Sequence, residues 1–315
     1  MKFSKKVKKL TGDASSRIFY RSKNKKSSSI IVYANKEKSS NLLNYDAVNK
    51  ILLENKILAP ILISKNYSKN YIEIQDFGNQ TIFHLFKKKK INKIKIYKQI
   101  IDLLNKLQSI RQKKVKNFNN KLYLIPNYTS KILEDEAKLF SEWYIEKKLK
   151  KREHKIFKKK YYKIIKNLIK KIRLKNNTFV HRDFHISNLM MVKNKIGIID
   201  SQDALIGNKA YDLASLIDDV RFKTSKSIKN KIFNFYMKFQ KNLNKKYFKN
   251  DFEIISVLRN LKIIGIFTRL AVRDKKQKYI KLIPHAWSLI ALRSTNNDKF
   301  KDLNDLLKNF RIMNK

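Results

Sequence analysis

The sequence predicts an α+β fold of two lobes, a small β-rich N-terminal lobe followed by a larger, mostly helical C-terminal lobe. The first 75 residues hold short β-branched and aromatic runs separated by turn-forming residues, a pattern typical of strands. From residue 81 onward, apolar residues recur at intervals of three and four, which favours amphipathic helices. One strand–turn–strand pattern, at residues 178–200, interrupts the helical part. We therefore expect the lobes at residues 1–78 and 79–315.

The composition excludes several classes of protein. With 315 residues, of which 43% are hydrophobic, the chain can form a substantial core, so it is not disordered despite its charge. It has no cysteine, which excludes disulfides, a thiol nucleophile and a cysteine-ligated zinc. The basic N-terminus lacks the apolar segment of a signal peptide, and no stretch approaches the roughly 18 apolar residues of a membrane span. We expect a cytoplasmic protein without a membrane partner.

The net charge of +49 raises the question of a nucleic-acid partner. Only 12 of the 74 basic residues are Arg, and the Lys residues are spread along the whole chain among Asn and Ile. Surfaces that read nucleic acids usually concentrate their charge and use Arg for bidentate contacts. The pattern therefore favours a compositional bias, and we expect no specific nucleic-acid binding.

The small lobe begins with T-G-D-A-S-S-R-I-F-Y at residues 11–20, which predicts two strands joined by a tight loop. The backbone N–H groups of such a loop can cover phosphates, and Gly12, Ser15 and Ser16 are the candidate nucleotide-binding residues. An ordinary hairpin remains the alternative, because the loop has a single glycine. The next strand, Ser29 to Tyr33, contains no lysine for the phosphates; Lys36 and Lys38 are nearest, and the role stays unassigned. A helix at 41–55 and strands at 61–64 and 71–74 complete the lobe.

The catalytic candidates lie in H-R-D-F-H-I-S-N at residues 181–188 and in Asp200. Two apolar runs, 189–192 and 196–199, flank the polar turn 193–195 and predict a hairpin, which would bring Asn188 and Asp200 to the same end. Two oxygen ligands close to Asp183 suit Mg²⁺ held together with substrate phosphates. This H-R-D-x-x-x-x-N…D arrangement is typical of phosphoryl-transfer kinases, where the first Asp receives the hydroxyl proton and the other two residues hold metal. The alternative is a buried hairpin with turn-forming Asp and Asn residues.

A second triplet, Asp76-Phe77-Gly78, resembles the metal-binding D-F-G of protein kinases but precedes the catalytic segment instead of following it. It lies where a hinge between lobes belongs. A structural role is favoured for this turn, and Asp76 is kept as a cofactor-binding candidate.

Helices account for most of the large lobe. Gly207 precedes Asp212, which we expect near a helix start, where it can bond backbone N–H groups and support the site. The apolar spacing predicts helices at 94–107, 132–143, 161–174, 210–219, 228–243 and 252–272.

These segments together resemble the aminoglycoside phosphotransferase-like family of kinases, and within it the bacterial anomeric kinases of N-acetylmuramate and N-acetylglucosamine. The resemblance is carried by 11–20, Q-D-F-G at 75–78, F-V-H-R-D-F-H-I-S-N-L-M at 179–190, I-I-D-S-Q-D-A-L-I-G at 198–207, and G-I-F-T-R-L-A-V-R-D at 265–274. It implies a protein-kinase-like two-lobed fold. Ser201 and Ser16 stand where the family commonly has aromatic residues.

The resemblance also implies ATP and Mg²⁺ as cofactors and an amino sugar as the small-molecule partner, phosphorylated at its C1 hydroxyl. It makes Asp183 the catalytic base and Asn188 and Asp200 the metal ligands. The substrate candidates are Asp203, Arg269 and Arg273, for the last two of which a surface ion pair is the alternative, and the structural supports are His181, Arg182, His185 and Asp212. Other acceptors of the same fold, such as choline, homoserine or an aminoglycoside, stay open, as does a basic nucleic-acid-binding protein with a degenerate kinase fold. The oligomeric state is left open.

Overall fold

The computed structural model describes residues 7–10, 17–23, 27–35, 40–88 and 91–312. The chain divides into two compact units, one of residues 1–126 with 178–206 and the other of residues 127–177 with 207–315. We describe each unit by itself. The units are defined by contacts within the chain, and the division into lobes after Gly78 stays a prediction.

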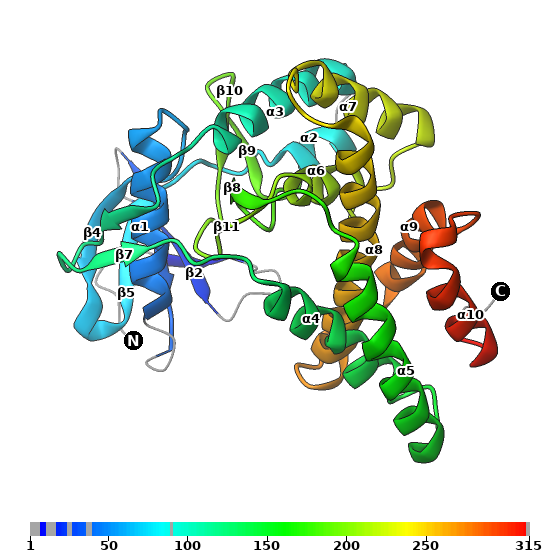
Figure 1. The fold of residues 1–315 in the computed structure, drawn as a ribbon. Coiled ribbons are helices and arrows are strands. Elements are labelled where there is room, and N and C mark those ends of the chain that lie inside the picture. The colour runs from blue at the N-terminus through cyan, green and yellow to red at the C-terminus, as the bar shows by residue number, and fades with distance from the viewer. Residues whose placement is uncertain (1–6, 11–16, 24–26, 36–39, 89–90, 313–315) are drawn as a thin grey trace. The chain divides into compact units, whose positions relative to one another are not determined.

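The first unit contains a five-stranded antiparallel sheet with one long helix beside it (Figure 1). The strand order is β1-β2-β3-β5-β4, and β1 pairs with β2 through Lys9 and Tyr20. The strands and helix expected from the sequence of the small lobe are confirmed. Their bounds are β1 Val7–Lys9, β2 Ile18–Lys23, β3 Ser28–Tyr33, α1 Ser40–Glu54, β4 Leu62–Asn66 and β5 Tyr71–Gln75.

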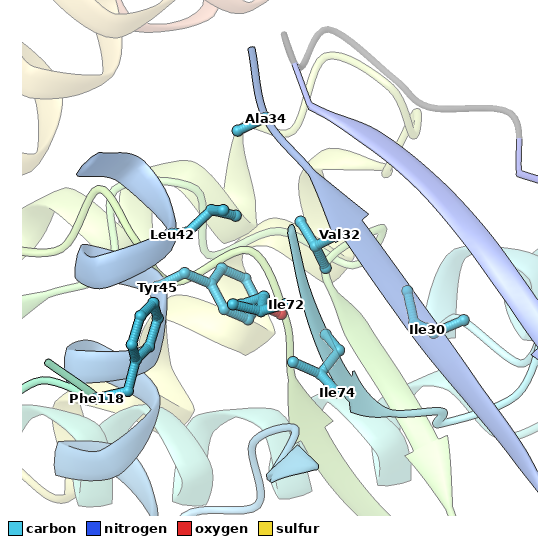
Figure 2. Close-up of a cluster of buried hydrophobic side chains, with 8 residues drawn as sticks. All are labelled: Ile30, Val32, Ala34, Leu42, Tyr45, Ile72, Ile74 and Phe118. Carbon is cyan, nitrogen blue, oxygen red and sulfur yellow. The ribbon is translucent and has the colours of Figure 1, made fainter. Parts of the chain in front are cut away.

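The core of this sheet forms because alternate residues of a strand share one face. Ile30, Val32 and Ala34 are buried in this way, and Leu42 and Tyr45 of α1 meet them. Figure 2 shows their side chains gathered between α1 and the strands, together with those of Ile72, Ile74 and Phe118. Each fully buried large apolar side chain contributes about 1.5–3 kcal/mol. The packing fixes α1 against β3 and β5.

The rest of the first unit positions the hairpin. It contains α2 Ile82–Lys88, α3 Lys93–Gln108, β6 Lys114–Lys116, β7 Leu122–Leu124, β8 Asn176–Val180, β9 Leu189–Val192, β10 Lys195–Ile198 and β11 Leu205–Asn208, of which β8 and β11 reach into the second unit. Strands β9 and β10 are antiparallel, which confirms the predicted hairpin. Its turn has two residues and not three, because Lys195 pairs with Val192. Lys193 and Asn194 have φ of 45° and 64°, the left-handed pair that two-residue hairpin turns need.

The second unit is built around α8, a helix of 28 residues that packs against α4, η3, α6 and α9 (Figure 1). Its other elements are α4 Ser130–Leu139, π-helical η3 Phe140–Ile145, α5 Lys151–Lys170, α6 Ala210–Ile217, α7 Lys226–Lys238, α8 Lys245–Val272, η4 Gln277–Leu282, α9 Ile283–Ser294, η5 Asp298–Phe300 and α10 Lys301–Asn309. None of the described helices is long and apolar enough to cross a membrane.

Four predicted helices need correction in their bounds. The helix expected at 228–243 ends at Lys238, and the helix expected at 252–272 begins at Lys245. The helix expected at 132–143 is α-helical only to Leu139, because the backbone widens into a π-helix over η3. The helix expected at 161–174 begins earlier and ends at Lys170. Beyond its end, the buried Asp251 of α8 accepts hydrogen bonds from the backbone N–H groups of Arg173 and Leu174, and these bonds hold the chain away from the helix path.

Candidate active site

The two predicted metal ligands lie at one end of the β9–β10 hairpin. Leu189 pairs with Ile198, and the Ile199 N–H donates to the Asn188 carbonyl at 3.0 Å. Asn188 therefore immediately precedes the first strand at the point where Asp200 follows the second. The placement predicted from the run lengths is confirmed.

The loop before β9, residues 183–188, is held by hydrogen bonds between its own backbone groups. The His185 N–H donates to the Asp183 carbonyl at 3.0 Å, and the Asn188 N–H donates to the His185 carbonyl at 2.9 Å. The Asn188 side chain closes the loop by donating from Nδ2 to the Asp183 carbonyl at 3.1 Å. Because the amide nitrogen is used as a donor, the opposite atom of the carboxamide, Oδ1, is the one suited to a metal.

His181 joins this loop to the end of β10. Its ring is fully buried, and Nε2–H donates to the Ile199 carbonyl at 3.2 Å, since only the ring can be the donor in this pair. Burial lowers the pKa of His181, although the carboxylates of Asp183, Asp200 and Asp203 oppose the shift. A neutral ring that holds the hairpin end agrees with the predicted supporting role.

Two residues beside the carboxylates have backbone conformations that side chains rarely adopt. Arg182 has φ of 72° and Asp200 has φ of 66°. Non-glycine residues in this region cost of order 1–3 kcal/mol and cluster at functional sites. Arg182 immediately precedes the predicted base, Asp183, and Asp200 is itself one of the two predicted metal ligands.

Three carboxylates influence one another at this end of the hairpin. Burial raises the pKa of Asp200; the Arg17 guanidinium opposes the shift, and the charges of Asp183 and Asp203 add to it. A divalent cation would relieve this repulsion. Within the described residues, no three His, Asp or Glu side chains are arranged as a metal cage. The amide oxygen of Asn188 and the carboxylate of Asp200 are oxygen donors, and such a donor set fits Mg²⁺, which is usually held by one or two carboxylates plus substrate phosphates.

Sequence reasoning missed the residue that touches Asp200 most closely. Arg17 Nη2 lies 2.5 Å from Asp200 Oδ1, and Arg17 Nη1 donates to Gln202 Oε1 at 2.5 Å. The guanidinium carbon is also 5.7 Å from the Phe19 ring centre and 5.6 Å from that of Tyr45. Arg17 was within the quoted 11–20 segment, but nothing local in the sequence indicated a contact with a residue 183 positions away.

Helix α1, far from Asp200 in the sequence, contacts the residue next to Asp200. Ser201 donates from its hydroxyl to Asn49 Oδ1 at 2.6 Å, and Asn49 Nδ2 donates to the Pro60 carbonyl at 3.1 Å. Tyr45, one helical turn earlier, is buried, and this burial raises its pKa to about 12. Ser201 is thus fully buried and hydrogen-bonded to α1 beside Asp200.

Asp203 and Arg182 lie at the outer edge of this cluster. Gln202 Nε2 donates to Asp203 Oδ2 at 2.6 Å, and Arg182 Nη1 is 3.5 Å from the Asp203 carbonyl. Asp203 is exposed, as a residue that meets a substrate hydroxyl must be. Its role in substrate binding stays a prediction.

Asp76 is bound by Arg21 of β2 and by the backbone of its own turn. Its Oδ2 is 2.6 Å from Arg21 Nε, and its Oδ1 accepts from Arg21 Nη2 at 2.9 Å and from the Gly78 N–H at 2.8 Å. Burial alone would raise the pKa of Asp76, but the hydrogen bonds from Arg21, Gly78 and Ser28 outweigh it and lower the pKa. Gly78 has φ of 81°, which explains the glycine at this turn. The geometry supports the structural interpretation of the triplet, and a nucleotide contact by Asp76 stays a prediction.

The remaining nucleotide candidates, Gly12, Ser15 and Ser16, lie outside the described residues, as do Lys36 and Lys38.

The predicted substrate arginines lie on α8 and at its C-terminus, in the second unit. Arg273 is exposed and forms a bidentate pair with Asp274, at 2.7 Å and 3.1 Å. Arg269 is half-buried, and its Nε has no hydrogen-bond partner among the described residues. Burial lowers the pKa of Arg269, and the charge of Arg273 adds to this shift. Arg269 therefore keeps an unused buried donor for a ligand, whereas Arg273 uses its Nε and Nη2 on Asp274.

Asp212 lies in the first turn of α6 and is fully buried. The expected position near a helix start is confirmed. The backbone N–H of Ala210 at this helix start is bonded by Asn208 Oδ1 at 2.9 Å, and Asn208 is in turn held by Asp251 at 2.8 Å. A bracing role for Asp212 stays a prediction.

Comparison with known proteins shows which proteins this chain is similar to. The N-acetylmuramate/N-acetylglucosamine kinase of Pseudomonas putida is 24% identical over 89% of this chain and 81% of its own length. That of Neisseria meningitidis is 30% identical over 51% of this chain and 50% of its own length. Among solved structures, a choline/ethanolamine kinase family protein of Mesorhizobium loti has a TM-score of 0.63 at 10% identity, covering 96% of this chain and 92% of that chain. The gentamicin complex of APH(2")-IIa has a TM-score of 0.63 at 14% identity, covering 90% and 93%.

The structural neighbours confirm the predicted fold class, since their likeness extends over nearly all of both chains. A model of the phosphotransferase enzyme family matches residues 6–238, which include the sheet, α1, the catalytic loop and the hairpin. The chain belongs to the phosphotransferase enzyme family, and it is a kinase of small molecules.

Proposed function

We propose that this protein transfers the γ-phosphate of ATP, with Mg²⁺, to the anomeric C1 hydroxyl of an amino sugar, N-acetylmuramate or N-acetylglucosamine. The observation that carries the proposal is the hairpin end, where Asn188 and Asp200 meet beside the loop of Asp183. The chemistry follows from these three side chains.

Asp183 orients the acceptor hydroxyl and takes its proton as the hydroxyl oxygen bonds to the γ-phosphorus, while the bond from that phosphorus to the β–γ bridging oxygen breaks and ADP leaves. Asn188 Oδ1 and the Asp200 carboxylate would hold Mg²⁺, which would neutralise charge on the phosphate oxygens. Asn188 is already fixed by its bond to the Asp183 carbonyl, so base and metal ligand move as one loop. Phosphoryl transfer needs alignment and charge neutralisation more than covalent help from the protein, and this arrangement supplies both.

The acceptor is proposed from the relatives. Those of Pseudomonas putida and Neisseria meningitidis, and the further ones of Pseudomonas aeruginosa and Caulobacter vibrioides, are all named N-acetylmuramate/N-acetylglucosamine kinase. The structural neighbours act on other acceptors, but at 10–14% identity they inform on the fold alone. From the sequence resemblance, Arg269 is also a proposed substrate contact. Asp203 and Arg273 are proposed to contact sugar hydroxyls.

ATP is a cytoplasmic donor, so we propose that the enzyme works in the cytoplasm. The absence of cysteine agrees with a reducing compartment.

The test is ATP consumption by the purified protein with a panel of N-acetylmuramate, N-acetylglucosamine, choline, homoserine and aminoglycosides. We expect turnover with the two amino sugars, and we expect ³¹P NMR of the product to place the phosphate on C1. EDTA should abolish the turnover. Turnover of another acceptor without either amino sugar would refute the proposed substrate and leave the kinase assignment in place. No ATP consumption with any acceptor would refute the activity itself.

The metal assignment is tested by Asp200→Ala. We expect Mg²⁺-dependent turnover to be lost, whereas Asp135→Asn, which changes an exposed carboxylate paired with Lys131 and Lys138 on α4, leaves turnover unchanged. Retained activity in Asp200→Ala would show that the metal is held elsewhere.

A further inference from the structure

Arg17 of the first unit forms an ion pair with Asp200 but has no role in the proposed reaction. Arg17 is 7% exposed, and its guanidinium contacts the proposed metal ligand directly, with Gln202 accepting from the other nitrogen. Phe19 and Tyr45 face the guanidinium from the apolar side. A buried Arg on a metal-binding oxygen means that Arg17 and a metal compete for the same atom.

Strand β3 contains neither Lys nor Arg. In protein kinases a lysine on this strand contacts the nucleotide phosphates. Here β3 is Ser28–Tyr33, and its residues that pack against α1, Ile30 and Val32, are buried in the apolar core (Figure 2). No side chain of β3 carries a positive charge, so this strand supplies no phosphate-binding cation.

Arg17 has the chemistry and the place for that role. It stands at the start of β2, the neighbour of β3 in the sheet, and Ile18 pairs with Tyr33. A guanidinium offers five donors in a planar fork that matches phosphate oxygens better than an ammonium does. Its partner Asp200 is the residue that the nucleotide's metal would take.

We propose that Arg17 is the phosphate-binding cation of this kinase, and that it exchanges Asp200 for the nucleotide phosphates when metal binds. This inference rests on the proposed function, since it needs a nucleotide and its metal. In the resting protein Arg17 and Asp200 neutralise each other. With metal and nucleotide present, the metal takes Asp200 and the phosphates take Arg17, so no buried charge is left unpaired.

The exchange makes a prediction that a purely structural role does not make. Because Arg17 shields Asp200, removing it should strengthen the binding of metal alone. Because Arg17 binds phosphate, removing it should weaken the binding of nucleotide. The two affinities should therefore move in opposite directions, whereas a residue that only holds Asp200 in position would weaken both when it is removed.

The experiment compares the wild type with Arg17→Met in two binding measurements. Mn²⁺ alone is titrated by electron paramagnetic resonance, and a fluorescent ATP analogue is titrated in the presence of Mg²⁺. We expect the Kd for Mn²⁺ to fall at least about threefold, and the Kd for the nucleotide to rise about 10- to 100-fold, the usual range for a lost charge-assisted hydrogen bond. Arg17→Gln, whose amide still donates, gives the same comparison if the methionine variant is unstable.

The matched control is Lys50→Met, which removes one positive charge from another ion pair of the same unit, Lys50 with Asp46 at 3.0 Å on α1. Both affinities should stay within about twofold of wild type, as expected for a single change outside the site. Unchanged nucleotide affinity in Arg17→Met or Arg17→Gln, or a parallel loss of both affinities, would overturn the proposal. If the wild type itself binds no nucleotide, the proposed function fails and this inference fails with it. If the wild type binds nucleotide and only the Arg17 variants fail to behave as expected, the inference falls and the proposed function stands.

Discussion

A substitution of Asp183 should lower kcat without changing nucleotide affinity. It lies in the H-R-D-x-x-x-x-N loop, and its charge acts on both Asp200 and His181. In Asp183→Asn we expect kcat to fall about 10²- to 10⁴-fold, the usual contribution of a positioned base, because the amide cannot take the hydroxyl proton. Nucleotide affinity should change little, because neither proposed metal ligand is altered. Steady-state kinetics and a nucleotide titration measure the two effects.

The control for this substitution is Asp135→Asn, the same chemical change at an exposed position of α4. A kcat in Asp183→Asn above about a tenth of the wild-type value would contradict the assignment of the base, given the size of that effect in other enzymes.

At the scale of elements, Gly265 of α8 determines how closely that helix approaches its neighbour. A Cβ at this position would lie 2.3 Å from the carbonyl carbon of Leu139 and 2.6 Å from the Phe140 nitrogen. Those atoms are backbone, at the point where α4 becomes the π-helix η3, and cannot move aside cheaply. Gly265→Ala gains about 1 kcal/mol of helix propensity. We expect the clash to exceed this gain and the free energy of unfolding to fall by about 2 kcal/mol.

Chemical denaturation of Gly265→Ala measures that change, with Lys249→Ala as the matched control on an exposed turn of the same helix. Equal or greater stability of Gly265→Ala would mean that α4 and α8 lie further apart than described.

Four helices of the second unit meet at one buried carboxylate, Asp218. It ends α6 and binds Lys229 of α7 at 3.0 Å, Arg293 of α9 at 2.9 Å and Ser256 of α8 at 2.6 Å. Burial alone would raise the pKa of Asp218, but the charges of Lys229 and Arg293 outweigh it and lower the pKa. In Asp218→Asn the buried Lys229 and the partly buried Arg293 lose their charged partner, so we expect a loss of about 3–5 kcal/mol in unfolding free energy at neutral pH.

The lowered pKa gives this prediction a pH dependence. A carboxyl with a depressed pKa stabilises the fold above its unfolded value near 3.9, and this contribution is lost as the pH falls through the folded-state pKa. The difference between wild type and Asp218→Asn should therefore be full at neutral pH and shrink only below about pH 4. Denaturation at several pH values measures it. A difference that already shrinks between pH 7 and pH 5 would contradict the ion pairs.

The elements predicted best were those with a local pattern, and the ends of elements were predicted worst. The hairpin followed from two apolar runs of four residues, and α1 from its apolar spacing. The end of α5 could not be foreseen, because it depends on Asp251, nearly 80 residues further along the chain. The widening of the helix at η3 likewise has no signature in a sequence that reads as regular helix, and it adjoins the place where Gly265 brings α8 close.

At the scale of the whole molecule, sequence predicted the site as far as its residues lie close along the chain. Asp183, Asn188 and Asp200 fall within one loop and one hairpin, so spacing was enough to bring them together. Arg17 reaches Asp200 across 183 positions, and only folding of the sheet onto the hairpin within the first unit makes that pair. Spacing therefore predicted which residues lie together at the hairpin end, whereas the ion pair of Arg17 with Asp200 required the structure.

The net charge of +49 also belongs to this scale, and it makes a prediction about polyanions. Lys residues spread over the whole chain attract nucleic acid without regard to sequence, and such binding depends on released counterions. We expect duplex DNA to be retained at 50 mM salt and its affinity to fall by roughly 10³- to 10⁵-fold at 200 mM. Electrophoretic shifts with several unrelated duplexes across that salt range measure it, with ATP turnover followed in parallel. Binding of one duplex in preference to the others at 200 mM salt would contradict this account, because diffuse Lys charge has no means of telling base pairs apart.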